Sequence, residues 1–337
     1  MVDKDHLVNA NVMISDYSFL KAYRELAAQA QAKGSQLWMQ INHPGRQSPR
    51  YLDKAPVSAS GVAMPSSLYI QPRALEHGEI LDLIERYGDA ALLAKESGMM
   101  GAQIHGAHGY LVSQFLSPLT NIRKDQWGGS LENRARFVLE IYKNMRSKVG
   151  PEFPLSIKIN SADFQRGAFT EEESMEVIQM LDQAGMDLIE VSGGTYERAA
   201  MVGTQHKEST VKREAYFMDF IVKVREKIKT PLMLTGGFRT IETMNKALEE
   251  GQLDFIGLGR PFCIFPNVAN DLISGEMTDC SVPDLLTGVD KIDITGMLQT
   301  PWNQFQLIRM GKGLEPDPNM DLWEVFEKVT GKQRPNL

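Results

Sequence analysis

The chain is poor in cysteine. Its 337 residues include two, Cys263 and Cys280, which are not spaced as a CxxC pair and have no cluster of other metal ligands beside them. A disulfide-stabilised secreted domain and a cysteine-ligated zinc site are therefore excluded as interpretations. Because free thiols persist in a reducing compartment, we expect a cytoplasmic protein.

Long apolar runs and an excess of positive charge are also missing. No run reaches the ~18 residues that span a membrane, and the first residues lack the apolar core of a signal peptide. The net charge is -7, whereas surfaces that bind nucleic acid or anionic lipid are positive. We therefore expect a small-molecule substrate and neither a nucleic acid nor a membrane partner; a homo-oligomer is compatible with the sequence.

Several catalytic motifs are absent. The chain contains no phosphate-binding P-loop and no GxSxG nucleophile motif. The pair Gly257 and Gly259 does not continue to the third glycine of a dinucleotide-binding GxGxxG turn. His105 and His108 have the spacing of two metal ligands, but no Cys or second His cluster completes a zinc site. No metal is expected.

What the chain does contain is a regular alternation of short apolar strands and amphipathic helices. A hydrophobic content of 42% with 23% charged residues is sufficient to bury the core of a soluble α/β protein. Strands are predicted at 36–41, 101–105, 155–160, 187–192, 231–235 and 254–258, and helices at 16–33, 78–97, 130–148, 170–184, 214–228 and 240–250. This alternation predicts a parallel sheet covered by helices.

Glycine and polar residues gather where each strand ends, which favours a TIM (β/α)8-type barrel over a doubly wound sheet. Only six of eight strands are found, so we expect a barrel that is incomplete at its N-terminal side by about 60 residues. The predicted domains are a barrel at 1–275 and a C-terminal helical and loop extension at 276–337, packed on the barrel.

Three proton-handling side chains follow the second predicted strand. His105, His108 and Tyr110 lie within six residues, beside the strand-breaking Gly106 and Gly109. A loop at the end of a rigid strand is a common place for catalytic groups. The alternative is that the histidines are structural and fully hydrogen-bonded.

Two further groups are candidate binding residues. Gly236 and Gly237, and then Gly259 and Arg260, end the last two strands, where exposed N–H groups and an arginine suit a phosphate; tight turns are the alternative. Lys158 lies within an apolar strand and requires an anion or a polar cofactor edge, or a structural partner such as Glu190. Gln40 can bond a heterocycle or the protein interior.

Two segments carry less chemistry. The loop 48–76, with four prolines, is long enough to be a functional lid or binding loop. Residues 121–136 are interpreted as a solvated loop followed by the start of a helix.

Taken together, the motifs resemble those of the Old Yellow Enzyme family of FMN-dependent NAD(P)H:flavin oxidoreductases, or ene-reductases. The resemblance extends from Met1 to about Pro318. It rests on the following stretches: Gln40 to Arg46, His105 to Leu111, Phe115 to Pro118, Asn121 to Arg134, Ser192 to Gly194, Gly236 with Gly237, and Gly259 to Pro261.

The resemblance implies a role for each candidate. His105 and His108 would bind the carbonyl oxygen of the substrate, and Tyr110 would supply a proton. Gln40 and Lys158 would contact the pyrimidine edge of FMN. The FMN phosphate would be held by the glycines after the last two strands, Gly236, Gly237 and Gly259, with Arg260.

The implied function is reduction of the activated C=C bond of an α,β-unsaturated carbonyl compound, with NAD(P)H as electron donor. The start of the chain departs from the family, whose members have two further strands before the segment that resembles Val2 to Lys4. Two alternative hypotheses remain: a truncated isoform or fragment with weak or no flavin binding, and a flavin-free barrel acting on a phosphorylated metabolite.

Overall fold

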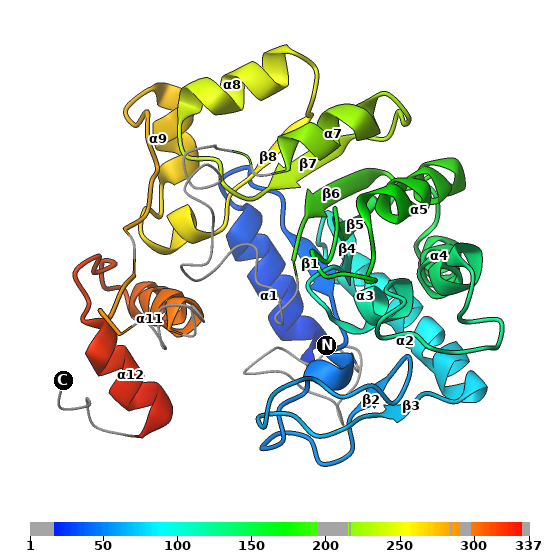
Figure 1. Ribbon diagram of the computed structural model, residues 1–337. Helices are drawn as coiled ribbons and strands as arrows, with labels where there is room; N and C mark the ends of the chain where they lie inside the picture. Colours follow the sequence, from blue (N-terminus) through cyan, green and yellow to red (C-terminus); the bar gives the residue numbers. More distant parts are fainter. Residues whose placement is uncertain (1–16, 195–214, 216, 284, 290–297, 332–337) are drawn as a thin grey trace. The chain divides into compact units, whose positions relative to one another are not determined.

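The computed structural model describes residues 17–194, 215, 217–283, 285–289 and 298–331 (Figure 1). These residues belong to two compact units. The first comprises the described parts of Met1–Arg198 and Phe220–Met233, and the second those of Ala199–Asp219 and Leu234–Leu337.

The central element is a six-stranded sheet with the strand order β1-β4-β5-β6-β7-β8. Its strands are β1 Trp38–Ile41, β4 Gly101–Gly106, β5 Leu155–Asn160, β6 Leu188–Ser192, β7 Leu232–Thr235 and β8 Phe255–Gly257. The pairs β1–β4, β4–β5 and β5–β6 are parallel. Every predicted strand is present, with its ends within two residues of the prediction, and the α/β barrel-type sheet with six strands is confirmed.

Helices alternate with these strands as predicted. They are α1 Leu20–Gln31, preceded by the 3₁₀ turn η1 Tyr17–Phe19, α2 His77–Glu96, α3 Leu111–Leu116, α4 Leu131–Val149, α5 Glu171–Ala184, α7 Met218–Arg225, α8 Ile241–Glu249, η3 Arg260–Cys263, α9 Val268–Ser274, α11 Gln299–Gly311 and α12 Leu322–Thr330. Thr170 and Glu173 form a capping box at the start of α5. The short helix α3 was not predicted.

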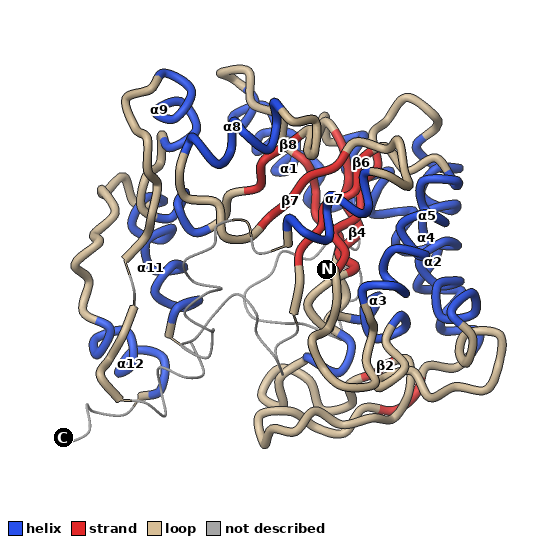
Figure 2. The backbone as a smooth tube through the Cα atoms, turned by 45° about the horizontal axis from the view of Figure 1, so that its top comes forward, coloured by secondary structure: helices blue, strands red, loops and turns tan. Residues whose placement is uncertain are grey.

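The two faces of the sheet differ in chemistry. Successive strand residues point to opposite faces, so Ile104, Ile157 and Ile189 share one face and all are fully buried. In the first unit α2 packs on α4 and α4 on α5, and the three helices lie side by side in both views (Figures 1 and 2). The other face carries polar side chains, which form the candidate site.

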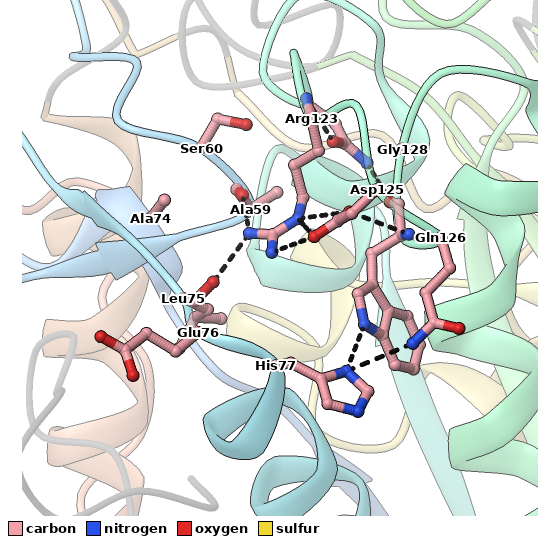
Figure 3. A network of polar contacts seen from close by, with 12 residues as sticks. Ala59, Ser60, Ala74, Leu75, Glu76, His77, Arg123, Asp125, Gln126 and Gly128 are labelled. Carbon is pink, nitrogen blue, oxygen red and sulfur yellow. Dashed lines mark hydrogen bonds and ion pairs between the residues drawn. The ribbon is translucent and has the colours of Figure 1, made fainter.

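The long connection between β1 and α2 is more ordered than predicted. It contains the 3₁₀ turn η2 Gly45–Gln47 and a small parallel sheet of β2 Val57–Ser58 and β3 Arg73–Ala74. Arg123 fastens this connection: its Nη1 donates to the carbonyl oxygens of Ala59 at 2.9 Å and Leu75 at 2.7 Å (Figure 3).

The interpretation of residues 121–136 as a solvated loop and helix start is only partly right, because several side chains of the loop are buried. Asn121, Trp127 and Arg134 are each less than 5% exposed. Figure 3 shows Arg123 paired with Asp125, at 2.6 Å, and the indole of Trp127 donates to Nδ1 of His77 at 3.0 Å. Lys124 and Gln126 are exposed, but Arg123 and Asn121 bind backbone carbonyls, so the segment acts as a brace for the neighbouring loops.

The second unit has a hydrophobic core of its own. It is formed by Ile264, Leu298, Trp302, Leu322 and Val325. Among its described residues after Phe262 the regular elements are helices, as expected for a helical tail. The domain boundary after residue 275 and the packing of the extension stay predictions. In the described part of the chain, no helix is both long and apolar enough to cross a membrane.

Candidate active site

The end of β4 is shaped by backbone that only certain residues adopt. A Cβ at Gly106 would lie 3.0 Å from the carbonyl oxygen of Lys158. His108 and Gly109 then have φ angles of 60° and 76°, in the left-handed region. The turn leads directly into α3, whose N-cap is Tyr110. Three predicted site residues are thereby brought to one place.

The three rings are in contact. The ring centroids of His105 and His108 lie 5.2 Å apart and those of His105 and Tyr110 lie 4.8 Å apart, both edge to face. Both His105 and Tyr110 are buried. The sequence grouped these residues by proximity along the chain, and the turn brings them together in space.

Neighbouring strand ends anchor the turn. The backbone N–H of His108 donates to Oδ1 of Asn160 at 3.1 Å, and its ring Nε2 lies 3.0 Å from Oγ of Ser192. Asn160 and Ser192 are register partners at the ends of β5 and β6. Gln47 donates to the carbonyl oxygen of His108 at 3.0 Å. The histidine is therefore held from three different elements.

Both histidines are neutral at physiological pH. Burial, followed by the charges of His108 and Lys158, holds the pKa of His105 well below its ordinary value. Burial and Lys158 lower the pKa of His108 to about 4. Nδ1 of His105 accepts from the N–H of Ala107 at 3.4 Å, so the proton of the neutral ring lies on Nε2. A neutral ring of this kind is a hydrogen-bond donor without a net charge.

A row of polar residues crosses the sheet beside the histidines. His105 on β4 is the register partner of Lys158 on β5, which is the register partner of Glu190 on β6. The ammonium of Lys158 lies 2.7 Å from Oε1 of Glu190. The ion pair that the sequence left open as an alternative is therefore present.

The row continues toward β1 through two amides. Nε2 of Gln40 donates to Oε1 of Gln103 at 2.7 Å, and Nε2 of Gln103 donates to Oε2 of Glu190 at 2.8 Å. The carboxylate of Glu190 is buried, whereas Gln40 is exposed. Sequence reasoning missed Gln103; the period-two spacing of Gln103 and His105 on one strand face was the signal that could have found it.

The FMN that the resemblance implies requires both donors and acceptors along its pyrimidine edge. Lys158 uses one donor on Glu190 and retains others, since an ammonium has three. Gln40 donates through Nε2 to Gln103, and within the described chain its Oε1 makes no hydrogen bond. A cation, an amide donor and an amide acceptor thus lie on one face of the sheet, which fits such an edge.

The second unit carries the glycines predicted to hold a phosphate. Gly236 and Gly237 have φ angles of 138° and 89°, which favour glycine. A Cβ at Gly257 would lie 1.8 Å from Oγ1 of Thr235. No atom lies within 4 Å of a Cβ placed at Gly259, and the adjacent Arg260 is exposed. Backbone and guanidinium are accessible to an anion here, and the phosphate role stays a prediction.

Gln114, on α3, connects the site to the loop after β1. Its Nε2 donates to the carbonyl oxygens of Pro44 at 3.1 Å and Gly109 at 2.6 Å. Its Oε1 accepts from the N–H of Arg46 at 3.2 Å and the hydroxyl of Ser58 at 2.8 Å. Both donors and both acceptor sites of the amide are used, so this buried side chain joins three loops to the helix.

Comparison with known proteins identifies relatives by sequence. Residues 3–278 match the family of NADH:flavin oxidoreductases and NADH oxidases. The NADH-dependent flavin oxidoreductase nadA of Aspergillus parasiticus is 36% identical over 295 residues, which cover 84% of this chain and 66% of the relative. The NADH oxidase of Thermoanaerobacter brockii is 34% identical over 278 residues, covering 81% of this chain and 42% of the relative.

Solved structures give the same result. An Old Yellow Enzyme homologue from Zymomonas mobilis matches with a TM-score of 0.70 and 25% identity, covering 82% of this chain and 78% of the other. A 2-naphthoyl-CoA reductase in complex with 2-naphthoyl-CoA matches with a TM-score of 0.77 and 27% identity, covering 88% of this chain and 46% of the other. The chain belongs to the NADH:flavin oxidoreductase / NADH oxidase family of FMN enzymes.

Proposed function

We propose that this protein is an NAD(P)H-dependent flavin oxidoreductase that reduces the activated C=C bond of an α,β-unsaturated carbonyl compound. One observation supports this proposal above the others: two neutral histidines and a tyrosine lie together at the end of β4, in register with Lys158. The balanced reaction consumes the enone, NAD(P)H and one proton, and gives the saturated carbonyl compound and NAD(P)⁺.

His105 and His108 bind the substrate carbonyl oxygen in this proposal. Negative charge develops on that oxygen as hydride reaches the β-carbon, and fixed N–H donors in a buried site stabilise such charge. The lowered pKa values of both rings favour hydrogen bonding over proton transfer to the oxygen. The backbone N–H of Ala107 bonds Nδ1 of His105 and leaves its proton on Nε2, and the hydroxyl of Ser192 holds the ring of His108 through Nε2.

Tyr110 delivers the proton to the α-carbon. A phenol holds its proton at neutral pH and gives it to a strongly basic carbon centre. As the N-cap of α3 and a ring neighbour of His105, Tyr110 is fixed on the same side of the turn as the oxygen-binding groups. Hydride and proton can then be added to one substrate without rearrangement of the protein.

The cofactor is FMN, and the electron donor is NAD(P)H. Lys158 and Gln40 would hold the pyrimidine edge, and Gly236, Gly237, Gly259 and Arg260 the phosphate. When bound, the flavin supplies hydride transfer between nicotinamide and substrate. The cation of Lys158 would stabilise negative charge on the reduced ring of a bound flavin, and the burial of the polar row would strengthen this effect.

The test is to titrate FMN into the purified chain and to follow NADH consumption under argon with and without 2-cyclohexenone. We expect FMN binding, and NADH consumption that depends on the enone. His105→Ala and His108→Ala should slow the enone-dependent rate by about 10²–10³, the cost of one lost oxyanion donor.

His77→Ala is the matched control, because His77 is exposed and bonded to Trp127 in the brace rather than in the site. Failure to bind FMN would contradict the proposal. So would an enone-dependent rate that His105→Ala and His108→Ala both leave unchanged.

A further inference from the structure

We propose that Glu190 is a positioning residue: its carboxylate sets the direction of the amide chain from Gln103 to Gln40, and thereby the atoms that Gln40 presents to the flavin. This inference rests on the proposed function, because it concerns how the chain's own residues meet the pyrimidine edge of FMN. It adds a residue that makes no contact with that edge itself.

The direction of the chain follows from donor and acceptor chemistry. A carboxylate only accepts, so the Gln103 group 2.8 Å from Oε2 of Glu190 must be its NH₂. The oxygen of Gln103 then faces Gln40, so Gln40 must donate to it through its own NH₂, at 2.7 Å. Gln40 is left with a free carbonyl oxygen and one further N–H. The buried carboxylate of Glu190 thus determines which atoms of the exposed Gln40 remain available for hydrogen bonding.

Glu190 is suited to this task by its burial and its pairing. It is 5% exposed, and Lys158 neutralises its charge at 2.7 Å through the other carboxylate oxygen. A buried ion pair by itself is weak evidence for a stabilising role. Here, however, the pair is extended by two amides that lead outward to an exposed side chain, so its second oxygen acts on the surface that meets the ligand.

A single substitution should reverse the chain. In Glu190→Gln the new amide keeps its oxygen toward Lys158 and turns its NH₂ toward Gln103. Gln103 must then present its oxygen to position 190 and its NH₂ to Gln40, which accepts through its own oxygen. Gln40 then has both N–H donors available, while its oxygen already accepts one hydrogen bond from Gln103, so the pattern of donors and acceptors at its exposed end is reversed. The flavin edge, which alternates donors and acceptors, then meets one mismatched group.

The experiment measures the Kd for FMN of the full chain by quenching of flavin fluorescence. We expect Glu190→Gln to weaken FMN binding about tenfold or more, the effect of one unsatisfied hydrogen-bonding group. The double variant Gln103→Glu/Glu190→Gln places the carboxylate one step along the chain. Gln40 again donates to it and regains its free oxygen, so we expect the affinity to return to within about threefold of the wild type.

Glu173→Gln is the matched control, since Glu173 is also an ion-paired, partly buried carboxylate, bound to Arg134 in the capping box of α5. It should leave the Kd for FMN unchanged. The inference is overturned if Glu190→Gln binds FMN as the wild type does, or if the double variant binds no better than the single one. A wild-type chain that binds no FMN overturns the proposed function itself, and with it this inference.

Discussion

His108 combines a left-handed backbone, a φ of 60°, with a ring that is held neutral. A non-glycine residue in this region is uncommon and is kept there only by its surroundings. Here the surroundings are the three anchors from Asn160, Ser192 and Gln47. The same packing that fixes the backbone removes water from the ring, so geometry and protonation have one cause.

The lowered pKa of His108 predicts how stability depends on pH. The folded pKa is about 4, below the ~6.5 of an unfolded histidine, so the unfolded state binds more protons between these values. Stability contributed by the neutral ring is present above pH 6.5 and is lost as the pH falls toward 4. We expect titration of His108 to lower the free energy of unfolding by about 1–2 kcal/mol between pH 7 and pH 5. Urea denaturation at the two pH values measures it.

His108→Gln should reduce that loss, because an amide does not titrate. His77→Gln serves as the comparison, since His77 is exposed. If His108→Gln and the wild type lose the same stability between pH 7 and pH 5, the ring is not held neutral in the folded protein.

Tyr110→Phe should separate the two halves of the catalytic cycle. The substitution removes the hydroxyl while leaving the ring that contacts His105. We expect reduction of the flavin by NADH to proceed nearly unchanged, and its reoxidation by an enone to slow by about 10²–10³, the usual range for a lost general acid. Stopped-flow absorbance of each half-reaction measures the two rates. Slower reduction with unchanged reoxidation would assign the tyrosine to nicotinamide binding.

The contacts of an individual residue could be predicted from the sequence where its burial requires an interaction partner, such as a counter-ion. A lysine in an apolar strand requires an anion, and Glu190 could be named from sequence as one choice. For Gln103 the sequence shows that it shares a strand face with His105, but not which group its amide binds. Only the register that aligns Gln40 with Gln103 shows that the two amides bond each other.

At the scale of elements, prediction succeeded where periodicity was long. The six strands and the long helices have a hydrophobic pattern that repeats, and their ends carry glycine or capping residues. β2 and β3 have two residues each, too few for any pattern. The brace around Arg123 was missed for another reason: its partners are backbone carbonyls, which have no signature in a sequence.

The contacts of Arg123 lead to a prediction about the long connection 48–76. Arg123→Ala removes charge-assisted bonds to the carbonyls of Ala59 and Leu75, each worth about 1.5–3 kcal/mol. We expect this connection to become the first site of limited proteolysis, with a lower free energy of unfolding. Cleavage sites mapped by mass spectrometry test the location.

Arg73→Ala is the control on the same connection. Arg73 pairs with Glu79 at 2.6 Å, but both side chains are more than a third exposed, so the pair contributes little. Equal protease sensitivity of the two variants would show that the buried contacts of Arg123 do not hold the connection.

At the scale of the molecule, the chain divides into two compact units, and each contains buried apolar side chains of its own. The sequence predicted a helical tail but not where the units divide. The division falls within β7, between Met233 and Leu234. Both sides of the boundary belong to one apolar strand, so no change in composition and no linker marks it in the sequence.

Because each unit has its own buried core, we expect a core substitution in one unit to destabilise that unit more than the other. Trp302 is fully buried, and its indole donates to the carbonyl oxygen of Met320 at 3.0 Å. Trp302→Ala should destabilise the second unit by about 3–5 kcal/mol. In hydrogen exchange we expect amides of α11 and α12 to lose protection while those of β4 and β5 retain it. Ile308→Ala on α11, at a half-exposed position, should change neither. A uniform loss of protection in Trp302→Ala would indicate one cooperative unit.

The saturated amide of Gln114 limits how this sequence can change in length. Its four bonds reach Pro44, Arg46, Ser58 and Gly109, and a Cβ at Gly45 would lie 2.1 Å from its oxygen. An insertion or deletion between these points would shift one partner and leave its bond unmade inside the protein. Changes in loop length are therefore better placed at 64–67, outside the segments that Gln114 ties together and the carbonyls of Val62 and Ala63 that bind Arg46.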